Sequence, residues 1–373
     1  MKNINRRNWI KTASLSAAAL GTASCQLRAE PKKILKSDSP VTKGIIRLSS
    51  NENRYAPSPK IKQAMMDAMD LSYLYSPGHY KPLIEKLATK EGVPTDHILL
   101  VSGSNEGLRL TGLCYAMNGG EIVTSTPTYK ALLSYAEEFG GTINTVDLDQ
   151  DLKFDLEEME KRVSAKTQMV FLCNPNNPTG TLLDGDKTRD FCDRVSDKTM
   201  VFSDEAYADY IEEENYPTMV PLVKQGKNVI VSRTFSKVYG MAGVRVGYLI
   251  ARPDIITTLK PRVMGYVNMM GVYGAIAALD DHEFYAHSLK KNKEAKQTIY
   301  DVCDDIGLRY VKSHTNFVFH QVNKNVRKYA EEMLALGVKV GRPFPPLTDW
   351  CRISTGNEAD MVAWREAMYK VYG

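Results

Sequence analysis

The sequence lacks the features that define several common classes of protein. Its 373 residues contain only six cysteines and six histidines, and no group of them has the spacing of metal ligands. The protein is therefore expected to have no metal site, and the scattered cysteines exclude a disulfide scaffold. In an oxidising compartment one disulfide could still form. The cysteines are Cys25, Cys114, Cys173, Cys192, Cys303 and Cys351.

The chain also has little net charge. It contains 48 basic and 44 acidic residues, a formal excess of +4. Four of the basic residues lie within residues 1–25, which hold no acid, so the remaining chain has 44 of each. This balance gives no sign of a nucleic-acid partner. With 43% hydrophobic residues the chain can bury a large core, and its length predicts one large and one smaller domain.

Residues 1–25 have the features of a twin-arginine export signal. The pair Arg6 and Arg7 precedes a mildly apolar run at residues 13–21, which is too short to span a membrane. A basic tail with no role in export is the alternative. The segment ends in small residues and Cys25, which resembles a lipoprotein cleavage site. We expect export to the periplasm, with Cys25 as a candidate lipid anchor and residues 26–46 as a linker.

Beyond the linker, short apolar runs alternate with segments that favour helices. Alternation of strands with helices of ten or more residues predicts an α/β fold with a mostly parallel sheet. We expect a large domain over residues 47–270 and a smaller α/β domain over residues 271–373. The predicted strands of the large domain are residues 97–101, 121–124, 142–146, 168–173, 199–202, 229–232 and 248–251.

The stretch from Arg233 to Gly247 carries the strongest chemical signal. Lys237 follows a predicted buried strand, and Thr234, Ser236 and Arg245 are residues that hold a phosphate group well. A lysine among phosphate-binding groups is what a pyridoxal phosphate enzyme requires, because its amine condenses with the cofactor aldehyde. Taken alone, the stretch fits an ordinary solvated lysine in a glycine-rich loop almost equally well.

Three more polar loops follow predicted strands: residues 102–106, 174–180 and 204–207. Ligands bind at the carboxyl ends of strands in open α/β sheets, so we expect these loops to meet the Lys237 loop. Asp204 directly follows a strand. A pyridoxal enzyme needs a carboxylate beside the pyridine nitrogen, and a cationic ring would in turn explain a buried aspartate. Asp204 is the candidate for that carboxylate.

In these motifs the chain resembles the fold-type-I, class I/II pyridoxal phosphate aminotransferases, and most of all the histidinol-phosphate aminotransferases. The matching motifs follow the family's order over roughly residues 45–373. They are residues 48–53, 103–107, 127–129, 174–180, 204–207, 234–237 and 351–354.

The resemblance implies a role for each site residue. Lys237 would form the internal aldimine and move the substrate proton, and Asp204 would pair with the ring nitrogen. The remaining cofactor contacts would come from Asn177 and Tyr207 at the ring hydroxyl, Tyr129 stacked on the ring, and Ser104, Asn105, Thr234, Ser236 and Arg245 around the phosphate. Tyr75 would reach the phosphate of the other subunit in a homodimer, to whose interface residues 47–75 would contribute. Asn53, Arg342 and Arg352 would bind substrate.

The loops expected to face the substrate depart from the family pattern. The Asn-Glu-Asn motif continues with Arg54 and Tyr55 instead of Pro-Tyr-Gly, and residues 340–346 are rich in proline. The sequence predicts an aminotransferase that moves an amino group between an amino acid, or an amino-acid-like phosphate, and a 2-oxo acid. Two alternatives remain: decarboxylation of an amino acid or phosphoamino acid on the same site, and an exported binding protein without turnover.

Overall fold

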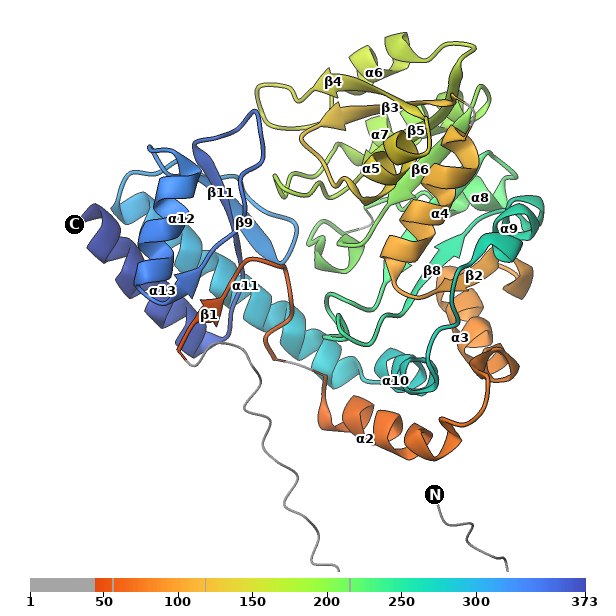
Figure 1. Ribbon diagram of the computed structural model, residues 1–373, viewed down its shortest axis with the longest axis horizontal. Coiled ribbons are helices and arrows are strands. Elements are labelled where there is room, and N and C mark those ends of the chain that lie inside the picture. Colours follow the sequence, from red (N-terminus) through yellow and green to blue (C-terminus); the bar gives the residue numbers. More distant parts are fainter. Residues whose placement is uncertain (1–43, 56, 118, 215) are drawn as a thin grey trace, which may run out of the picture. The chain divides into compact units, whose positions relative to one another are not determined.

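A seven-stranded sheet is the largest element of the computed structural model, which describes residues 44–55, 57–117, 119–214 and 216–373. The predicted export signal and Cys25 lie outside the described residues. The strand order is β2-β8-β7-β6-β5-β3-β4 (Figure 1), and only the two pairs that involve β8 are antiparallel. The predicted mostly parallel α/β sheet is confirmed. Its strands are β2 (Ile98–Val101), β3 (Glu121–Thr126), β4 (Thr142–Asp147), β5 (Thr167–Cys173), β6 (Met200–Asp204), β7 (Val229–Thr234) and β8 (Gly247–Ile250).

The central strands are apolar along nearly their whole length because helices cover the sheet. Phe171, Phe202 and Val231 are fully buried on neighbouring strands, as is typical of parallel sheets packed on both faces. Among the described residues, no helix has the length and apolar character needed to cross a bilayer. The helices of this part are α2 (Pro59–Asp67), α3 (Lys81–Glu91), α4 (Ser104–Ala116), α5 (Ala131–Glu138), α6 (Leu156–Arg162), α7 (Gly185–Ser196), α8 (Val220–Lys224), α9 (Pro253–Leu259) and α10 (Met269–Leu279).

A second hydrophobic core lies around two small two-stranded sheets. In one sheet β9 pairs antiparallel with β11, in the other β1 pairs in parallel with β10, and Tyr329 and Trp364 are fully buried in this core. Leu48 belongs to this core, so the start of the described chain packs with its end. The elements are β1 (Ile46–Arg47), α11 (His282–Asp305), β9 (Phe317–Gln321), α12 (Val326–Ala335), β10 (Val338–Lys339), β11 (Trp350–Ser354) and α13 (Glu358–Tyr372).

The change from one core to the other occurs within α11, whereas the sequence placed the domain boundary at residue 271. Val272 and Ala278 of α10 pack in the core of the large sheet, and Leu289 on α11 still packs against it. From Ala295 onward, the buried apolar residues of α11 belong to the second core. A long helix can present different faces to two cores, and no break in the sequence marks the change.

Candidate active site

The carboxyl ends of β5, β6 and β7 open onto a cavity of about 250 Å³. The four loops that the sequence analysis singled out all contribute to its wall, together with the segment after β1 and one residue of β11. The lining residues are Ser50, Asn51, Glu52, Ser104, Asn105, Tyr129, Cys173, Asn177, Asp204, Ala206, Tyr207, Ser236, Lys237, Ala242, Arg245 and Arg352. Chain segments far apart in sequence therefore build one site.

Lys237 is the amine of this cavity. It lies three residues beyond the end of β7, its Nζ donates to the Asn51 carbonyl at 3.1 Å, and it lies 5.3 Å from the centre of the Tyr207 ring. Burial is the main cause that lowers the pKa of Lys237 to about 8, and the nearby Arg352 lowers it further. With such a pKa, about a tenth of the molecules carry a neutral Lys237 at pH 7, far more than for an ordinary lysine, and the neutral amine is the form that attacks a carbonyl.

Asp204, the last residue of β6, is the buried carboxylate of the cavity and is 2% exposed. Its Oδ1 has no hydrogen-bond partner among the described residues. Burial raises the pKa of Asp204 to about 7, although the Ala206 amide and Lys237 oppose this shift. An unpartnered buried carboxylate is costly, and a cationic ring N–H would supply the missing partner. On this observation the site fits the pyridinium of pyridoxal phosphate.

The part of the cavity wall around the start of α4 suits an anion. Ser104 and Asn105 form the first turn of α4, where backbone N–H groups and the helix dipole favour negative charge. Arg245 Nη1 lies 3.4 Å from Ser236 Oγ. Arg245 packs so closely on the start of α4 that a Cβ at Gly103 would lie 2.1 Å from its guanidinium, and the φ of 80° at Gly103 also favours glycine. These groups can hold the cofactor phosphate.

Thr234 does not line the cavity, contrary to the predicted cofactor contact. Its Oγ1 accepts the Ser236 backbone N–H at 3.1 Å and donates to Ser236 Oγ at 3.0 Å. Thr234 is the last residue of β7 and is 5% exposed, and its hydroxyl orients Ser236. Thr234 therefore supports the anion-binding end without touching it.

The polar side chains in the middle of the cavity are held by one another. Tyr129 donates through its hydroxyl to Asn105 Oδ1 at 2.6 Å, and Asn51 Nδ2 donates to the Tyr207 hydroxyl at 2.9 Å. Asn177 Oδ1 accepts from Arg352 Nη1 at 2.6 Å, which leaves the Asn177 amide N–H groups for a ring hydroxyl. Burial raises the pKa of both tyrosines, so both phenols are neutral and able to donate.

Arg352 is a second buried cation in the wall of the cavity. Its Nη2 donates to the Ser49 carbonyl at 2.7 Å, and its guanidinium packs against the rings of Phe317 and Phe344. Burial lowers the pKa of Arg352, and the nearby Arg342 acts in the same direction. The Nε of Arg352 is buried without a partner among the described residues. Since two of the five guanidinium N–H groups are used, the Nε–H and one N–H on each Nη remain for an anionic ligand group.

Three further predicted contacts lie outside the wall of the cavity. Asn53 is directed elsewhere, because its Nδ2 donates to the Val238 carbonyl and to Ser288 Oγ. Arg342 is exposed and lies over the Phe344 ring at 4.5 Å, so it adds positive charge near Arg352 without lining the cavity. Tyr75 is 85% exposed, as expected for a residue predicted to serve the other subunit.

Of the two asparagines in the Asn-Glu-Asn motif, the structure places Asn51 in the cavity wall, whereas the sequence analysis named Asn53 as a substrate contact. Asn51 lines the cavity and is 2% exposed, and its φ of 55° lies in the left-handed region. Asparagine is one of the few residues that adopt this conformation readily. The resulting turn directs Asn51 and Glu52 to the cavity and Asn53 away from it. Asn51 and Asn53 are the same type of residue, so residue type alone does not show which of them faces the cavity.

The described cysteines form no disulfide: Cys114, Cys173, Cys192, Cys303 and Cys351 are all free. Cys173 ends β5 and lines the cavity, where burial raises the pKa of its thiol well above the usual value. A protonated, buried thiol packs as a small apolar group, which is the role expected for most of these residues.

The fold and the cavity are those of a pyridoxal phosphate-dependent transferase of fold type I. The model of the family "Aminotransferase class I and II" matches residues 43–367, so the chain belongs to that family. It is 38% identical to a histidinol-phosphate aminotransferase of Moorella thermoacetica over 300 residues, 80% of this chain and 78% of the relative. A second such enzyme, from Caldicellulosiruptor saccharolyticus, is 33% identical over 88% of this chain and 92% of its own length.

A solved structure agrees with these comparisons. The histidinol-phosphate aminotransferase of Sinorhizobium meliloti, in complex with pyridoxal-5'-phosphate, is 28% identical to this chain with a TM-score of 0.80. The alignment covers 88% of this chain and 91% of that structure. The predicted fold, cofactor and enzyme class are confirmed: this chain is an aminotransferase that uses pyridoxal phosphate.

Proposed function

We propose that this enzyme takes the amino group from a donor that bears a carboxylate or phosphate and transfers it to a 2-oxo acid. The observation that carries the proposal is the unpartnered Nε of buried Arg352, in the cavity that also holds Lys237. A fixed guanidinium recognises carboxylate or phosphate groups through paired hydrogen bonds. Arg342 adds a second positive charge on the same side.

Each of the main residues of the cavity would have a separate role in amino transfer. Pyridoxal phosphate, when bound, supplies an electron sink for the substrate Cα. Asp204 would keep the ring nitrogen protonated, and the end formed by Ser236 and Arg245 would hold the phosphate. Lys237, whose lowered pKa of about 8 makes its neutral form accessible near neutral pH, would take the proton from the substrate Cα and deliver it to the cofactor carbon that is joined to the amino nitrogen. Arg352 would fix the donor so that Cα lies within reach of that amine.

The donor can be identified with a pair of compounds that differ only in the anionic group. The relatives named above make L-histidinol phosphate the first donor to test, with unphosphorylated L-histidinol as its control and 2-oxoglutarate as acceptor. A panel of amino acids and phosphoamino acids extends the test. We expect glutamate to form from anionic donors and at least tenfold more slowly from the neutral control. Release of CO₂ without glutamate would show a decarboxylase instead.

We also propose that the working unit is a homodimer with shared sites. Tyr75 is 85% exposed and Tyr73 is 81% exposed, and Met69, Met264 and Tyr266 are each at least 60% exposed. Exposed apolar groups of this kind are typical of a surface that another chain covers. The Tyr75 ring contacts Tyr266, and its hydroxyl would reach the cofactor of the other subunit.

Mixing the two inactive variants Lys237→Ala and Tyr75→Ala tests the shared site. In the proposed dimer, each site takes Lys237 from one chain and Tyr75 from the other chain. In a mixed dimer one site would lack both residues and the other would keep both, so dissociating and reassociating the two variants should restore about a quarter of the wild-type activity. Sedimentation velocity should show a dimer at assay concentration. An active monomer, or no restored activity in the mixture, would contradict the proposal.

Export through the twin-arginine route is the third part of the proposal. Its support is the Arg6-Arg7 pair before the apolar run at residues 13–21. The cavity consists of segments that meet only in the folded chain, so cofactor loading in the cytoplasm requires a route for folded proteins. Bound cofactor would also stabilise the folded enzyme before export.

The export proposal predicts where a charge-conserving variant accumulates. Arg6→Lys together with Arg7→Lys should leave active enzyme in the cytoplasm and empty the periplasm. The control is Lys2→Arg with Lys11→Arg, which keeps the charge and the arginine pair. Cell fractionation with an activity assay measures both. A wild-type enzyme found wholly in the cytoplasm, or an exported double-lysine variant, would reject this localisation.

A further inference from the structure

Asn51 connects the two cores of the enzyme through all of its polar groups. Its backbone N–H donates to Ser354 Oγ at 2.8 Å, and Ser354 Oγ donates to Asn51 Oδ1 at 3.0 Å. Its Nδ2 donates to the Tyr207 hydroxyl, on the side of the large sheet. A left-handed residue such as Asn51 persists where its surroundings determine it fully. The position of its carbonyl is therefore set by several parts of the fold together.

That carbonyl accepts two hydrogen bonds. Lys237 Nζ donates to it at 3.1 Å, and Asn316 Nδ2, which comes from the second core, donates to it at 3.0 Å. The Asn51 carbonyl is the acceptor that the structure gives to the Lys237 amine. A carbonyl has two lone pairs, so Asn316 occupies the one that the lysine leaves. Asn316 is 2% exposed, and its Oδ1 has no partner among the described residues, so donation to Asn51 is what orients its side chain.

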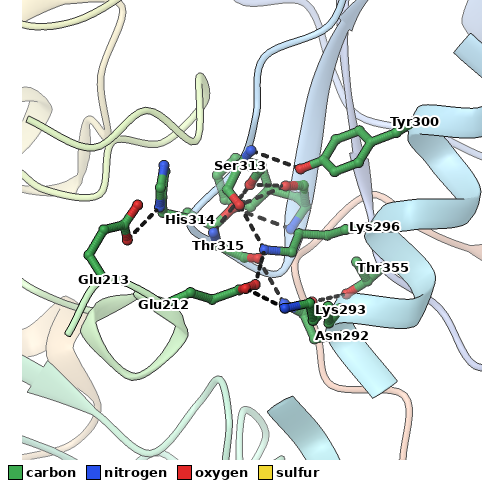
Figure 2. Close-up of polar contacts among 11 residues, drawn as sticks. Glu212, Glu213, Asn292, Lys293, Lys296, Tyr300, Ser313, His314, Thr315 and Thr355 are labelled. Carbon is green, nitrogen blue, oxygen red and sulfur yellow. Dashed lines mark hydrogen bonds and ion pairs between the residues drawn. The ribbon is translucent and has the colours of Figure 1, made fainter. Parts of the chain in front are cut away.

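The backbone around Asn316 is held by hydrogen bonds from two other elements. Thr355 donates to the Asn316 carbonyl through both its N–H and its hydroxyl, each at 3.0 Å. The same hydroxyl lies 2.9 Å from Asn292 Oδ1, and Asn292 Nδ2 donates to the Thr315 carbonyl at 3.0 Å (Figure 2). Asn316 is thus fixed by α11 and by the turn after β11.

A buried lysine on α11 completes this support. Lys296 is 5% exposed and donates to the Ser313 carbonyl at 2.8 Å, and it lies 3.3 Å from Glu212 Oε1. The Ser313 N–H donates to the Tyr300 hydroxyl at 2.9 Å (Figure 2). Segment 313–316 therefore cannot move without breaking several buried hydrogen bonds, each of which is costly to leave unmade.

We propose that Asn316 is a positioning residue for the reacting lysine: its amide fixes the Asn51 carbonyl that holds the Lys237 amine. This inference rests on the proposed role of Lys237. The amine needs a defined place near the substrate whenever it is not bound to the cofactor. A rigid carbonyl acceptor supplies that place, and the second donor keeps the carbonyl from turning away or gaining a water molecule.

Asn316 also has a consequence for the charge of Lys237. A carbonyl acceptor stabilises an ammonium more than an amine, and sharing that carbonyl with Asn316 weakens the effect. The charged groups that face Lys237 are Arg352 and Arg245, which lower its pKa, and Glu52 and Asp204, which raise it. Removing the Asn316 amide should strengthen the effect of the carbonyl on the Lys237 ammonium. The pKa of Lys237 should therefore rise.

The experiment titrates Lys237 in the cofactor-free, full-length enzyme. Trinitrobenzenesulfonate reacts with neutral amines, and peptide mass spectrometry reports the labelling rate of Lys237 as a function of pH. We expect Asn316→Ala to raise the pKa of Lys237 by about half a unit, and Asn316→Asp, which places a carboxylate there, by about one to two units. In the loaded enzyme, kcat should fall about tenfold with little change in KM, since the donor site is intact.

Asn228→Ala is the matched control. Asn228 also donates its side-chain amide to a backbone carbonyl, that of Ser196 at 2.8 Å, but it lies at the amino end of β7, away from the cavity. It should leave the pKa of Lys237 and kcat unchanged. Circular dichroism checks folding. If the alanine variant does not fold, the pKa of Lys237 in Asn316→Asp, whose side chain has the same size as the native one, tests the proposal.

Two results would overturn the inference, and they are distinguishable. If borohydride fails to fix the cofactor on Lys237 in the wild-type enzyme, the proposed role of Lys237 is wrong and the inference is wrong with it. If the cofactor is fixed there but both Asn316 variants leave the pKa of Lys237 at its wild-type value, only the positioning role is wrong. A fall in kcat without a pKa change would mark Asn316 as a merely structural residue.

Discussion

Lys237→Ala is expected to abolish multiple turnover of amino transfer, with a loss of about 10⁴-fold or more. The variant removes both the nucleophile that binds the cofactor covalently and the base that moves the substrate proton, and a positioned base alone contributes about 10²- to 10⁴-fold. Borohydride reduction of the cofactor-loaded protein should fix no cofactor on the chain. Steady-state assays and intact-protein mass spectrometry measure the two effects.

Lys296→Met is the matched control for this prediction, because Lys296 is the other buried lysine discussed above. Burial lowers the pKa of both amines, but Lys296 lies in the network of Figure 2 and not in the cavity. Its loss leaves the Ser313 carbonyl unpaired, so the variant should be less stable by about 1–3 kcal/mol and still fix cofactor on Lys237. Wild-type turnover of Lys237→Ala would refute the proposed mechanism.

Asp204→Asn is expected to slow the chemical step by roughly 10²- to 10⁴-fold while cofactor binding suffers less. The substitution keeps the size of the side chain and removes the charge that would keep the ring nitrogen protonated. Losing one partner of a buried ion pair costs about 3–5 kcal/mol, which corresponds to this range if it is realised in the transition state. Single-turnover kinetics with saturating cofactor separate the chemical step from binding. An unchanged rate would mean that Asp204 is not the partner of the ring.

The same substitution should stabilise the cofactor-free protein at neutral and alkaline pH. The pKa of Asp204 in the folded protein is about 7, against an ordinary value of 3.8, so the folded state holds its proton more tightly than the unfolded state does. The stability that this group contributes is present below pH 4 and is lost as the pH rises through 7. The difference corresponds to roughly 4 kcal/mol. Because part of the loss has already occurred at pH 5, urea unfolding at pH 5 and pH 8 should differ by about 2–3 kcal/mol in the wild-type protein and show no such difference in Asp204→Asn.

The opposite effects on stability and on catalysis have one cause. A carboxylate without a partner in a buried cavity destabilises the empty enzyme, and a cationic ring at Asp204 Oδ1 relieves this cost. Adding pyridoxal phosphate should therefore stabilise the wild-type enzyme more at pH 8 than at pH 5. An equal effect at both values would argue against a charged contact between Asp204 and the ring.

Several parts of the site were predictable from sequence because short-range chemistry specifies them. A lysine just beyond a buried strand, a carboxylate at the end of another, and Gly103 before a helix each depend on a few neighbouring residues. Parallel strands place their carboxyl ends at one edge, so Lys237, Asp204 and Asn177 had to meet once the α/β pattern was recognised. The same reasoning placed Ser104, Ser236 and Arg245 at an anion-binding end.

Other parts could not be predicted because they depend on contacts between distant segments. The choice between Asn51 and Asn53 follows from a left-handed turn that Ser354 and Asn316 hold from the second core. The displacement of Thr234 from the wall follows from where β7 ends. Asn316 itself carried no signal, since its role is visible only beside a carbonyl that lies 265 residues away in the chain.

The sequence by itself determined the class of the enzyme: the alternation of strands and helices, the lysine and the aspartate at strand ends, and the phosphate-binding residues, all of which act through their own side chains and their local backbone. Only the tertiary structure decided how that chemistry is adjusted. Burial raises the pKa of Asp204 and lowers that of Lys237, and the second core supplies Arg352 and the donor that fixes the Asn51 carbonyl. Burial and shared acceptors are properties of packed segments, so no single stretch of the chain contains them.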